Sequence, residues 1–147
     1  RLPAGFYVRA GHPLLARSGV SGPDLVPYGI ASVRVPEAVQ VGLGALLGLQ
    51  DGLRLPLAVE CDDLSLLRAL AMSTDTVIAS TDTVIASTDA GSAADVQAGR
   101  LVRLSLPDLP PLFSDMAAVS LQGRSHAPMA QFALDFIDRL ALAMVPV

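Results

Sequence analysis

The sequence predicts an α/β domain with a largely parallel sheet. Short β-prone segments alternate with segments of helical periodicity along most of its 147 residues, and parallel neighbouring strands need crossover connections that helices supply. The length suffices for one domain with a substantial core. A strongly amphipathic segment near the C-terminus adds one long helix to this pattern.

The first third of the chain alternates between strand and helix signals. Residues 6–10 are short and β-prone, and Gly11 begins a turn that ends them. Residues 21–25 carry Pro and Asp where a short helix would start, and residues 29–33 are again β-like. Residues 36–49 are predicted to be helical although they contain three glycines, each of which costs roughly 0.5–1 kcal/mol relative to alanine.

The middle of the chain repeats the same rhythm. Residues 57–61 indicate a strand, and either Asp62 or Asp63 can cap the helix that follows, in which leucines recur at helical spacing. Adjacent carboxylates face different directions, so capping is favoured over a pair for acid–base catalysis. Residues 90–98 are compatible with a short helix.

The last third combines a strand, a linker and the clearest helix signal. Residues 101–106 alternate apolar and polar side chains, as a half-exposed strand does, and three prolines mark residues 107–114 as a linker. Residues 116–121 are the last strand candidate. The helix predicted after them has an apolar face with helical spacing, formed by Met129, Phe132, Ala133, Phe136, Ile137, Leu140 and Met144.

Composition excludes several classes of function for this segment. The net charge is −4, and the ten basic residues are all arginines spread without a basic stripe, so no nucleic-acid surface is expected here. No uncharged apolar run is long enough to span a bilayer. Cys61 is the only cysteine, which excludes an intramolecular disulfide; we expect a small buried apolar side chain and a cytoplasmic location.

An exact tandem repeat interrupts the pattern. The seven residues from Ser73 to Ala79 recur unchanged as residues 80–86, and residues 87–89 begin a third copy. Their β-branched content predicts a strand, but only one strand fits at this place, so one copy is surplus. A seven-residue ambiguity of register follows, in which either copy can fill the strand. The repeat is either a genuine duplication or a cloning artefact.

Residues with catalytic chemistry are sparse. His12 and His126 are the only histidines, and neither has the spacing of a metal ligand. His12 is predicted to stabilise a turn, and His126 to be solvated ahead of a helix. No nucleophile motif, phosphate-binding loop or dinucleotide fingerprint is present, so the sequence predicts no enzyme, no cofactor and no metal site.

Several short motifs in a fixed order give the chain a family resemblance. They are Arg9-Ala-Gly-His-Pro-Leu14, Asp24-Leu25 with Tyr28 three residues on, Val59-Glu60 before a capped helix, Gly99-Arg-Leu-Val102 and the final amphipathic helix. In this order they resemble the C-terminal part of the effector-binding domain of a LysR-type transcriptional regulator. The resemblance implies a fold similar to type 2 periplasmic binding proteins, in which a small effector binds in a cleft between two α/β subdomains.

The resemblance also implies a division of the chain. Residues 1–10 would form a crossover strand, residues 11–106 the second subdomain, residues 107–114 the returning crossover linker, and residues 115–147 a strand and helix of the first subdomain. The helix-turn-helix through which the family binds DNA, its linker helix and the first half of the sensor would lie outside this sequence.

Candidate effector-binding residues follow from the resemblance. In the family the loop after the strand at residues 29–33 faces the effector, which indicates Ser32, Val33 and Arg34. Their hydroxyl and guanidinium groups can hold a carboxylate, although Arg34 could equally be a solvated surface residue. At the start of the repeat strand, where many relatives have a glycine-rich turn, this sequence has Thr74 and Asp75, or their copies Thr81 and Asp82.

Two kinds of partner are expected. One is a small-molecule effector, for which a carboxylate is a candidate, and the other is a further copy of the chain. The apolar face of the final helix would lack most of its sheet, and large open apolar patches favour association. DNA would be contacted only through regions absent from this chain, and no membrane is involved. Two alternatives remain at this point: a fragment of a periplasmic solute-binding protein of a transporter, and a small α/β enzyme.

Overall fold

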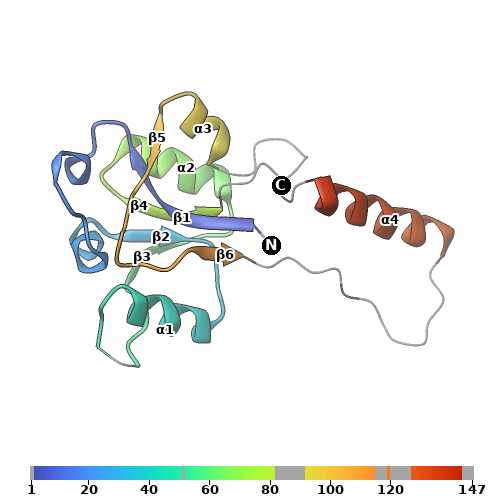
Figure 1. The fold of residues 1–147 in the computed structure, drawn as a ribbon, viewed down its shortest axis with the longest axis horizontal. Coiled ribbons are helices and arrows are strands. Elements are labelled where there is room, and N and C mark those ends of the chain that lie inside the picture. Colours follow the sequence, from blue (N-terminus) through green and yellow to red (C-terminus); the bar gives the residue numbers. More distant parts are fainter. Residues whose placement is uncertain (1, 51, 82–91, 115–118, 120–126, 144–147) are drawn as a thin grey trace. The chain divides into compact units, whose positions relative to one another are not determined.

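The computed structural model describes residues 2–50, 52–81, 92–114, 119 and 127–143. These residues belong to two compact units, one formed by residues 2–114 and one within residues 115–147. Each unit is described by itself. Within the described residues, the larger unit contains a sheet with helices on both faces, and the smaller one contains a long helix (Figure 1).

The described residues of the larger unit form six strands, three α-helices and two 3-10 helices. The strands are β1 (Leu2–Arg9), β2 (Ile30–Ser32), β3 (Leu57–Glu60), β4 (Val77–Thr81), β5 (Leu101–Arg103) and β6 (Leu112–Ser114). The helices are α1 (Glu37–Leu46), α2 (Leu64–Ser73) and α3 (Ala93–Gln97), with η1 (Pro13–Ala16) and η2 (Gly22–Tyr28) before β2.

The sheet is mixed rather than largely parallel as predicted. Its order is β3-β2-β4-β1-β5, and β6 also pairs with β1. Strands β2, β3 and β4 are parallel, whereas β1 runs antiparallel to β4, β5 and β6. Strands β2 to β6 therefore share one direction, and β1, which lies between β4 and β5, runs opposite to them. The prediction of a largely parallel sheet was wrong for the pairings of β1, because the crossover rule does not apply to this first strand.

Alternating side chains of the strands pack into two separate hydrophobic cores, one on each face of the sheet. In β1, Phe6 and Val8 join one cluster and Tyr7 joins the other. In β4, Val77 and Ile78 divide in the same way, and both are almost fully buried. This two-residue period is that of a pleated strand. The sheet is therefore covered on both faces, by α2 on one and by α1 with the 3-10 helices on the other.

Helix α1 begins one residue later than predicted and ends three residues earlier, at Leu46. The chain then turns through Gly48, whose φ of +75° favours glycine. Within the helix, Gly44 lies against the following loop, and a Cβ atom there would come within 2.6 Å of the Leu53 carbonyl oxygen. This close approach explains why a glycine is tolerated in the helix.

Helix α2 confirms the predicted cap. The Asp63 carboxylate accepts hydrogen bonds from the N–H groups of Ser65 and Leu66, at 2.9 and 3.2 Å. Cys61, just before this cap, is partly buried and packs against the core on the α2 face. Helix α3 is also terminated locally: Gly99, two residues after its end, has the left-handed conformation that commonly ends helices.

A buried ion triad ties α2, α3 and the chain before β5 together. The Asp95 side chain in α3 is fully buried, and both of its carboxylate oxygens are bonded. Arg68 Nε donates to one oxygen at 2.6 Å and Arg100 Nε donates to the other at 2.8 Å. A buried carboxylate requires such partners because its desolvation is costly.

Further differences from the predicted elements lie in the last third of the chain. The predicted strand at residues 101–106 is shorter in the structure, and the predicted linker contains β6, which pairs with the start of β1. The strand candidate at residues 116–121 lies outside the described residues, apart from Val119, and so does His126. The three residues of β6, directly after two prolines, are too few to predict a strand by periodicity.

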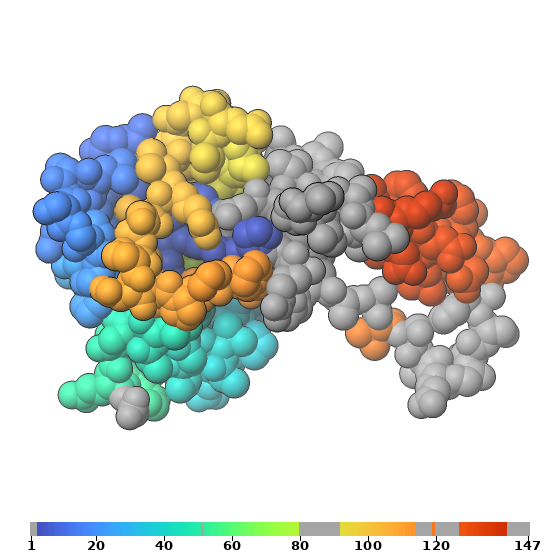
Figure 2. Space-filling model, in the orientation of Figure 1, coloured from blue at the N-terminus to red at the C-terminus, as the bar shows by residue number. Residues whose placement is uncertain are grey.

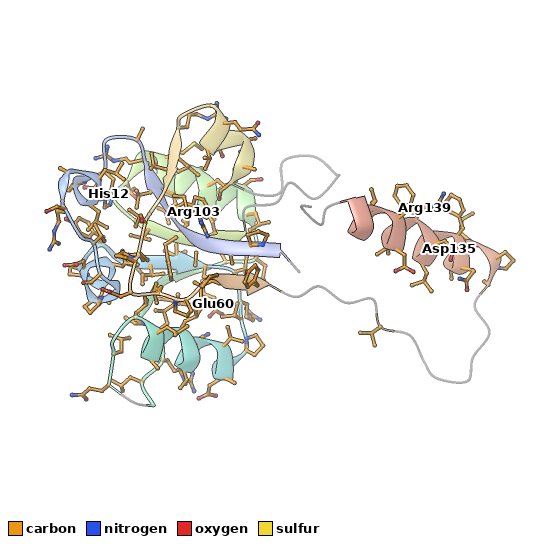
Figure 3. The ribbon with its side chains drawn as sticks, in the orientation of Figure 1. His12, Glu60, Arg103, Asp135 and Arg139 are labelled. Atoms are coloured by element: carbon orange, nitrogen blue, oxygen red, sulfur yellow. The ribbon has the colours of Figure 1, made fainter. Side chains whose placement is uncertain are left out.

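The smaller unit contains α4 (Pro128–Ala143), which confirms the predicted C-terminal helix. Within the helix, Gln131 donates to the Asp135 carboxylate at 2.8 Å, and Arg139 donates to the Asp135 carbonyl. Figure 3 labels Asp135 and Arg139 on this helix. Several large apolar side chains of α4 are exposed, namely Met129, Phe132, Phe136 and Ile137.

Candidate functional site

The parallel strands bring two of the predicted segments to one edge of the sheet. Ser32 ends β2 and Glu60 ends β3, and these two residues are register partners. The carboxyl ends of parallel strands meet at the same edge, and ligands of open α/β sheets bind beyond that edge. We call residues 32–34 together with residues 60–62 the carboxyl edge.

Ser32 and Val33 form the buried base of the carboxyl edge. Ser32 is 5% exposed, and its carbonyl oxygen accepts a hydrogen bond from the Cys61 N–H at 3.1 Å. Val33 is partly buried and packs against the core on the α2 face. The backbone here is fixed by the sheet on one side and by the core on the other, so the loop that follows starts from a rigid position.

Arg34 projects from this base into solvent. Its side chain is 76% exposed, and its Nε donates to Glu60 Oε1 at 3.2 Å. Its backbone N–H donates to Asp62 Oδ1 at 3.1 Å. Its two Nη atoms form no hydrogen bond to any residue that the structure describes. The guanidinium is thus held through Nε, and its two Nη atoms, the outer fork, are open to a ligand.

Helix α1 braces the same edge. The Gln40 amide donates to Glu60 Oε2 at 3.3 Å and to the Val35 carbonyl at 3.2 Å. Glu60 therefore accepts from both Gln40 and Arg34, one on each carboxylate oxygen. Figure 3 labels Glu60 near the end of β3. Gln40 and the role of Glu60 were not predicted, because only pairing of β2 with β3 brings them beside Arg34.

Thr74 and Asp75 lie at the opposite end of the parallel strands. They immediately precede β4, and Val77 of β4 is the register partner of Ile30, the first residue of β2. Because β1 is antiparallel to β4, its last residue, Arg9, reaches the same place. We call the residues Arg9, His12, Thr74 and Asp75 the amino edge.

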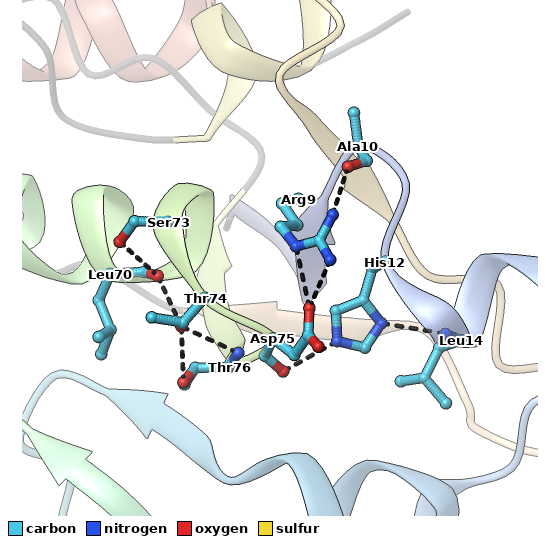
Figure 4. A network of polar contacts seen from close by, with 9 residues as sticks. All are labelled: Arg9, Ala10, His12, Leu14, Leu70, Ser73, Thr74, Asp75 and Thr76. Carbon is cyan, nitrogen blue, oxygen red and sulfur yellow. Dashed lines mark hydrogen bonds and ion pairs between the residues drawn. The ribbon is translucent and has the colours of Figure 1, made fainter.

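Polar groups at the amino edge bind one another (Figure 4). Arg9 lies 2.7 Å from Asp75 Oδ1 through Nη2 and 2.9 Å through Nε. The Thr74 hydroxyl donates to the Leu70 carbonyl at the end of α2, and it accepts from the Thr76 N–H at 3.1 Å. Both residues are therefore engaged in joining α2 and β1 to the start of β4.

His12 completes the amino edge and confirms the predicted turn. Its side chain is 1% exposed, and its Nδ1 accepts a hydrogen bond from the Leu14 N–H at 3.1 Å. Its Nε2 lies 2.8 Å from the Asp75 carbonyl oxygen and must donate to it. This pair of bonds requires the neutral ring with its proton on Nε2. His12 thus caps η1 and connects it to the residues just before β4.

The structure separates the two predicted groups of site residues. Ser32, Val33 and Arg34 lie at the carboxyl edge, whereas Thr74 and Asp75 lie at the amino edge, one strand length away. Thr81, the copy of Thr74, ends β4 and pairs with Ala4 of β1. Asp82, the copy of Asp75, lies outside the described residues. The second copy of the repeat therefore begins where β4 reaches the carboxyl edge.

Two surface hollows lie elsewhere in the larger unit. One of about 260 Å³ lies between β1 and the segment of residues 103–112, and Figure 2 shows β1 in blue beneath that orange segment. The other, of about 320 Å³, lies between the same segment and η1. Arg103 lines both, and its Nη2 donates to the Ala4 carbonyl at 2.9 Å.

Two carboxylates of this unit have lowered pKa values. Hydrogen bonds from the Ser21 hydroxyl and N–H, with a contribution from Arg17, lower the pKa of Asp24. Burial by itself raises the pKa of Asp95, but the hydrogen bonds and charges of Arg100 and Arg68 outweigh it and lower that pKa. Both groups stabilise local structure, and neither belongs to the carboxyl edge.

The described residues contain no group of three or more side chains that could hold a metal ion. No helix within them is both long enough and apolar enough to cross a membrane.

Comparison with known proteins finds similar transcriptional regulators. The SDS degradation transcriptional activation protein of Pseudomonas sp. (strain ATCC 19151) is 34% identical over 134 residues, covering 88% of this chain and 40% of that protein. The crystal structure of HinK, a LysR family transcriptional regulator from Pseudomonas aeruginosa, superposes with a TM-score of 0.60 at 18% identity, over 92% of this chain and 43% of that one. No family model matches the chain.

A further structure assigned to the LysR family supports the same relationship. The PA01 protein of Pseudomonas aeruginosa gives a TM-score of 0.62 at 17% identity, over 95% of this chain and 45% of that one. The chain thus resembles a transcriptional activation protein in sequence and LysR-family transcriptional regulators in fold. It has the fold of their effector-binding domain, which is periplasmic-binding-protein-like of type 2. The chain spans less than half the length of each of these three relatives.

Proposed function

We propose that this chain is the effector-sensing segment of a bacterial LysR-type transcriptional regulator. A small molecule would bind at the carboxyl edge, in a cleft whose opposite wall is formed by the other subdomain. DNA would be bound by a helix-turn-helix outside this sequence, in the cytoplasm. The observation that carries the proposal is the open guanidinium of Arg34 at the carboxyl ends of three parallel strands.

The open fork of Arg34 favours an anionic effector. A guanidinium binds carboxylate or sulfate oxygens through two parallel N–H donors, and Glu60 occupies only its Nε. Glu60 and Asp62 place negative charge beside this fork, so the anion must approach from the Nη side. The curated relative is named for degradation of SDS, an amphiphilic anion, and a carboxylate presents the same head-group charge.

A direct test compares anionic and neutral amphiphiles on the 147-residue chain. Decanoate, decyl sulfate and decanol would be titrated below their aggregation concentrations and followed by two-dimensional NMR. We expect both anions, but not decanol, to shift amide signals of residues 32–34 and 60–62. Arg34→Gln should weaken anion binding about tenfold, as expected for one charge-assisted contact of about 1.4 kcal/mol.

Arg17→Gln is the matched control for this test. Arg17 is also exposed and paired with one carboxylate, Asp24 at 2.8 Å, but it lies in the segment before η2. The control should bind the anions as the unchanged chain does. Equal loss of binding in both variants, or equal binding of decanol, would contradict an anion site at Arg34.

We also propose that the chain associates with copies of itself. The apolar side chains exposed on α4 carry this proposal, since open apolar patches favour association. Light scattering at high micromolar concentration should show a dimer or larger species, and the double change Phe132→Ser with Phe136→Ser should shift it toward the monomer. A single monomeric species of the unchanged chain would contradict this.

The solute-binding alternative is not favoured. It shares the type 2 fold, but the curated relative is a transcriptional activation protein and the similar structures belong to regulators. The relatives are likewise regulators rather than enzymes, which leaves the α/β enzyme alternative without support.

A further inference from the structure

We propose that β4 has two interchangeable registers, seven residues apart. The tandem repeat makes residues 80–89 identical to residues 73–82, so the identity extends over ten residues rather than seven. Strand β4 occupies Val77–Thr81, and residues 84–88 have the same five side chains in the same order. Sliding the chain by one repeat therefore puts an identical residue into every position of the strand.

Few sequences could fill the position of β4, because its side chains must pack into a core on each face of the sheet. The identity of the second copy is therefore significant. Val77 is fully buried in the core on one face of the sheet, and Ile78 is 2% exposed in the core on the other. The strand is central, with β2 on one side and β1 on the other. A slip by an odd number of residues normally turns apolar side chains to the wrong face. Here the repeat restores each side chain to its own face.

The contacts at the amino edge can also be reproduced. Arg9 and His12 bind the carboxylate and the carbonyl group of Asp75, and the copy of Asp75 is Asp82. Thr74 and Thr76 have copies at positions 81 and 83. In the shifted register Thr74 itself stays next to α2, where its hydroxyl and N–H bond the Leu70 carbonyl. The shift thus need not sacrifice the end of α2.

Connection lengths leave the two registers close in free energy. In the structure, residues 74–76 join α2 to β4 and residues 82–92 join β4 to α3; after the shift, residues 74–83 and 89–92 would do so. Connections of two to six residues are usual in α/β units. Each register has one connection of usual length and one with seven extra residues. Loop-closure entropy favours the register of the structure by only about 1.3-fold.

The register also sets how much chain follows β4 at the carboxyl edge. Eleven residues separate β4 from α3 in the structure, and four would do so after the shift. A ligand that distinguishes these arrangements would shift their populations. This consequence rests on the proposed function, whereas the two registers themselves are tested below without any ligand.

The decisive experiment uses the redundancy of the two copies. Ile78→Asp, Ile85→Asp and the double variant would be made in the 147-residue chain, and unfolding in urea would be followed by circular dichroism. With two equivalent registers, each single change removes one folded arrangement and lowers the folding equilibrium constant only about twofold. The double change removes both, and the cooperative transition should disappear because an aspartate then enters the core.

A single register gives a different pattern. Ile78→Asp would then lower the folding equilibrium constant by about a hundredfold or more while Ile85→Asp left it unchanged, and that result would overturn the proposal. A folded double variant would overturn it as well, since β4 would then not need either copy.

Exchange between the registers in the otherwise unchanged strand is measured by thiol labelling. Val77→Cys in a Cys61→Ser background places a thiol at a fully buried position of the described register. We expect a fraction of this thiol to react much faster than global unfolding allows. Protection of the whole population until global unfolding would show a single register and overturn the proposal.

Discussion

The two ends of the parallel strands use their polar residues in opposite ways. At the amino edge, Arg9, His12 and Asp75 bind one another, and the histidine is buried. At the carboxyl edge, Arg34 is 76% exposed and its outer donors are open. Polar groups that satisfy one another hold the fold together, whereas a fixed but open donor is free to recognise a ligand.

The same distinction separates residues that the sequence alone placed together. Thr74 and Asp75 were predicted to face the effector along with Arg34, but their bonding partners are α2, β1 and the turn after β1. Effector binding by them remains a prediction. If it occurs, it must compete with contacts that already hold the start of β4, whereas Arg34 has no such competitor for its Nη atoms among the described residues.

The largest effect is expected where a polar group is most completely enclosed. Asp95→Asn removes the buried charge that pairs with both Arg68 and Arg100, which should cost about 3 kcal/mol of unfolding free energy. Urea unfolding at pH 7 measures this. A loss below about 1 kcal/mol would show that the enclosed triad is no more important than a surface pair.

The lowered pKa of Asp95 adds a pH dependence with a definite sign. Its charged form is favoured by folding, so its contribution is present above the unfolded pKa near 4 and is lost as the pH falls through the lower folded value. The stability of the unchanged chain should therefore fall below about pH 4. Asp95→Asn should reduce that slope, and an identical acid profile for the variant would contradict the assignment.

His12→Ala is expected to have the next largest effect, because it opens the amino edge. The change leaves the Leu14 N–H and the Asp75 carbonyl without their partner and creates a cavity beside Tyr28, whose ring centre lies 4.7 Å away. We expect a loss of about 2–3 kcal/mol in unfolding free energy. His12→Asn should recover part of it, since asparagine can still cap η1. Equal losses for both variants would show that the cap contributes nothing.

The smallest effect on stability is expected at the open edge. Arg34→Gln removes one exposed ion pair with Glu60, and such pairs contribute roughly 0–1 kcal/mol. The unfolding midpoint in urea should therefore hardly move, although the same change is expected to weaken anion binding. A destabilisation as large as that of His12→Ala would show that Arg34 is a structural residue and remove the contrast between the edges.

Local chemistry explains which elements could be predicted. The cap at Asp63, the turn at His12 and the periodic face of α4 depend on residues close together in sequence, and the structure confirms all three. The missed strand β6 depends on pairing with Leu2 to Ala4, more than a hundred residues away. Gln40 and Glu60 likewise meet only because β2 pairs with β3.

The sequence by itself determined the alternation of strands and helices, the family resemblance and the repeat, because these are patterns of neighbouring residues. Tertiary structure alone decided the direction of β1 and the pairing of β6, and it decided which end of the sheet receives each polar residue. Strand pairing joins distant segments through backbone hydrogen bonds, which every sequence can form, so its direction leaves little trace in the local pattern. The parallel pairing of β2 with β4 places Arg34 at the open edge and Asp75 at the closed one.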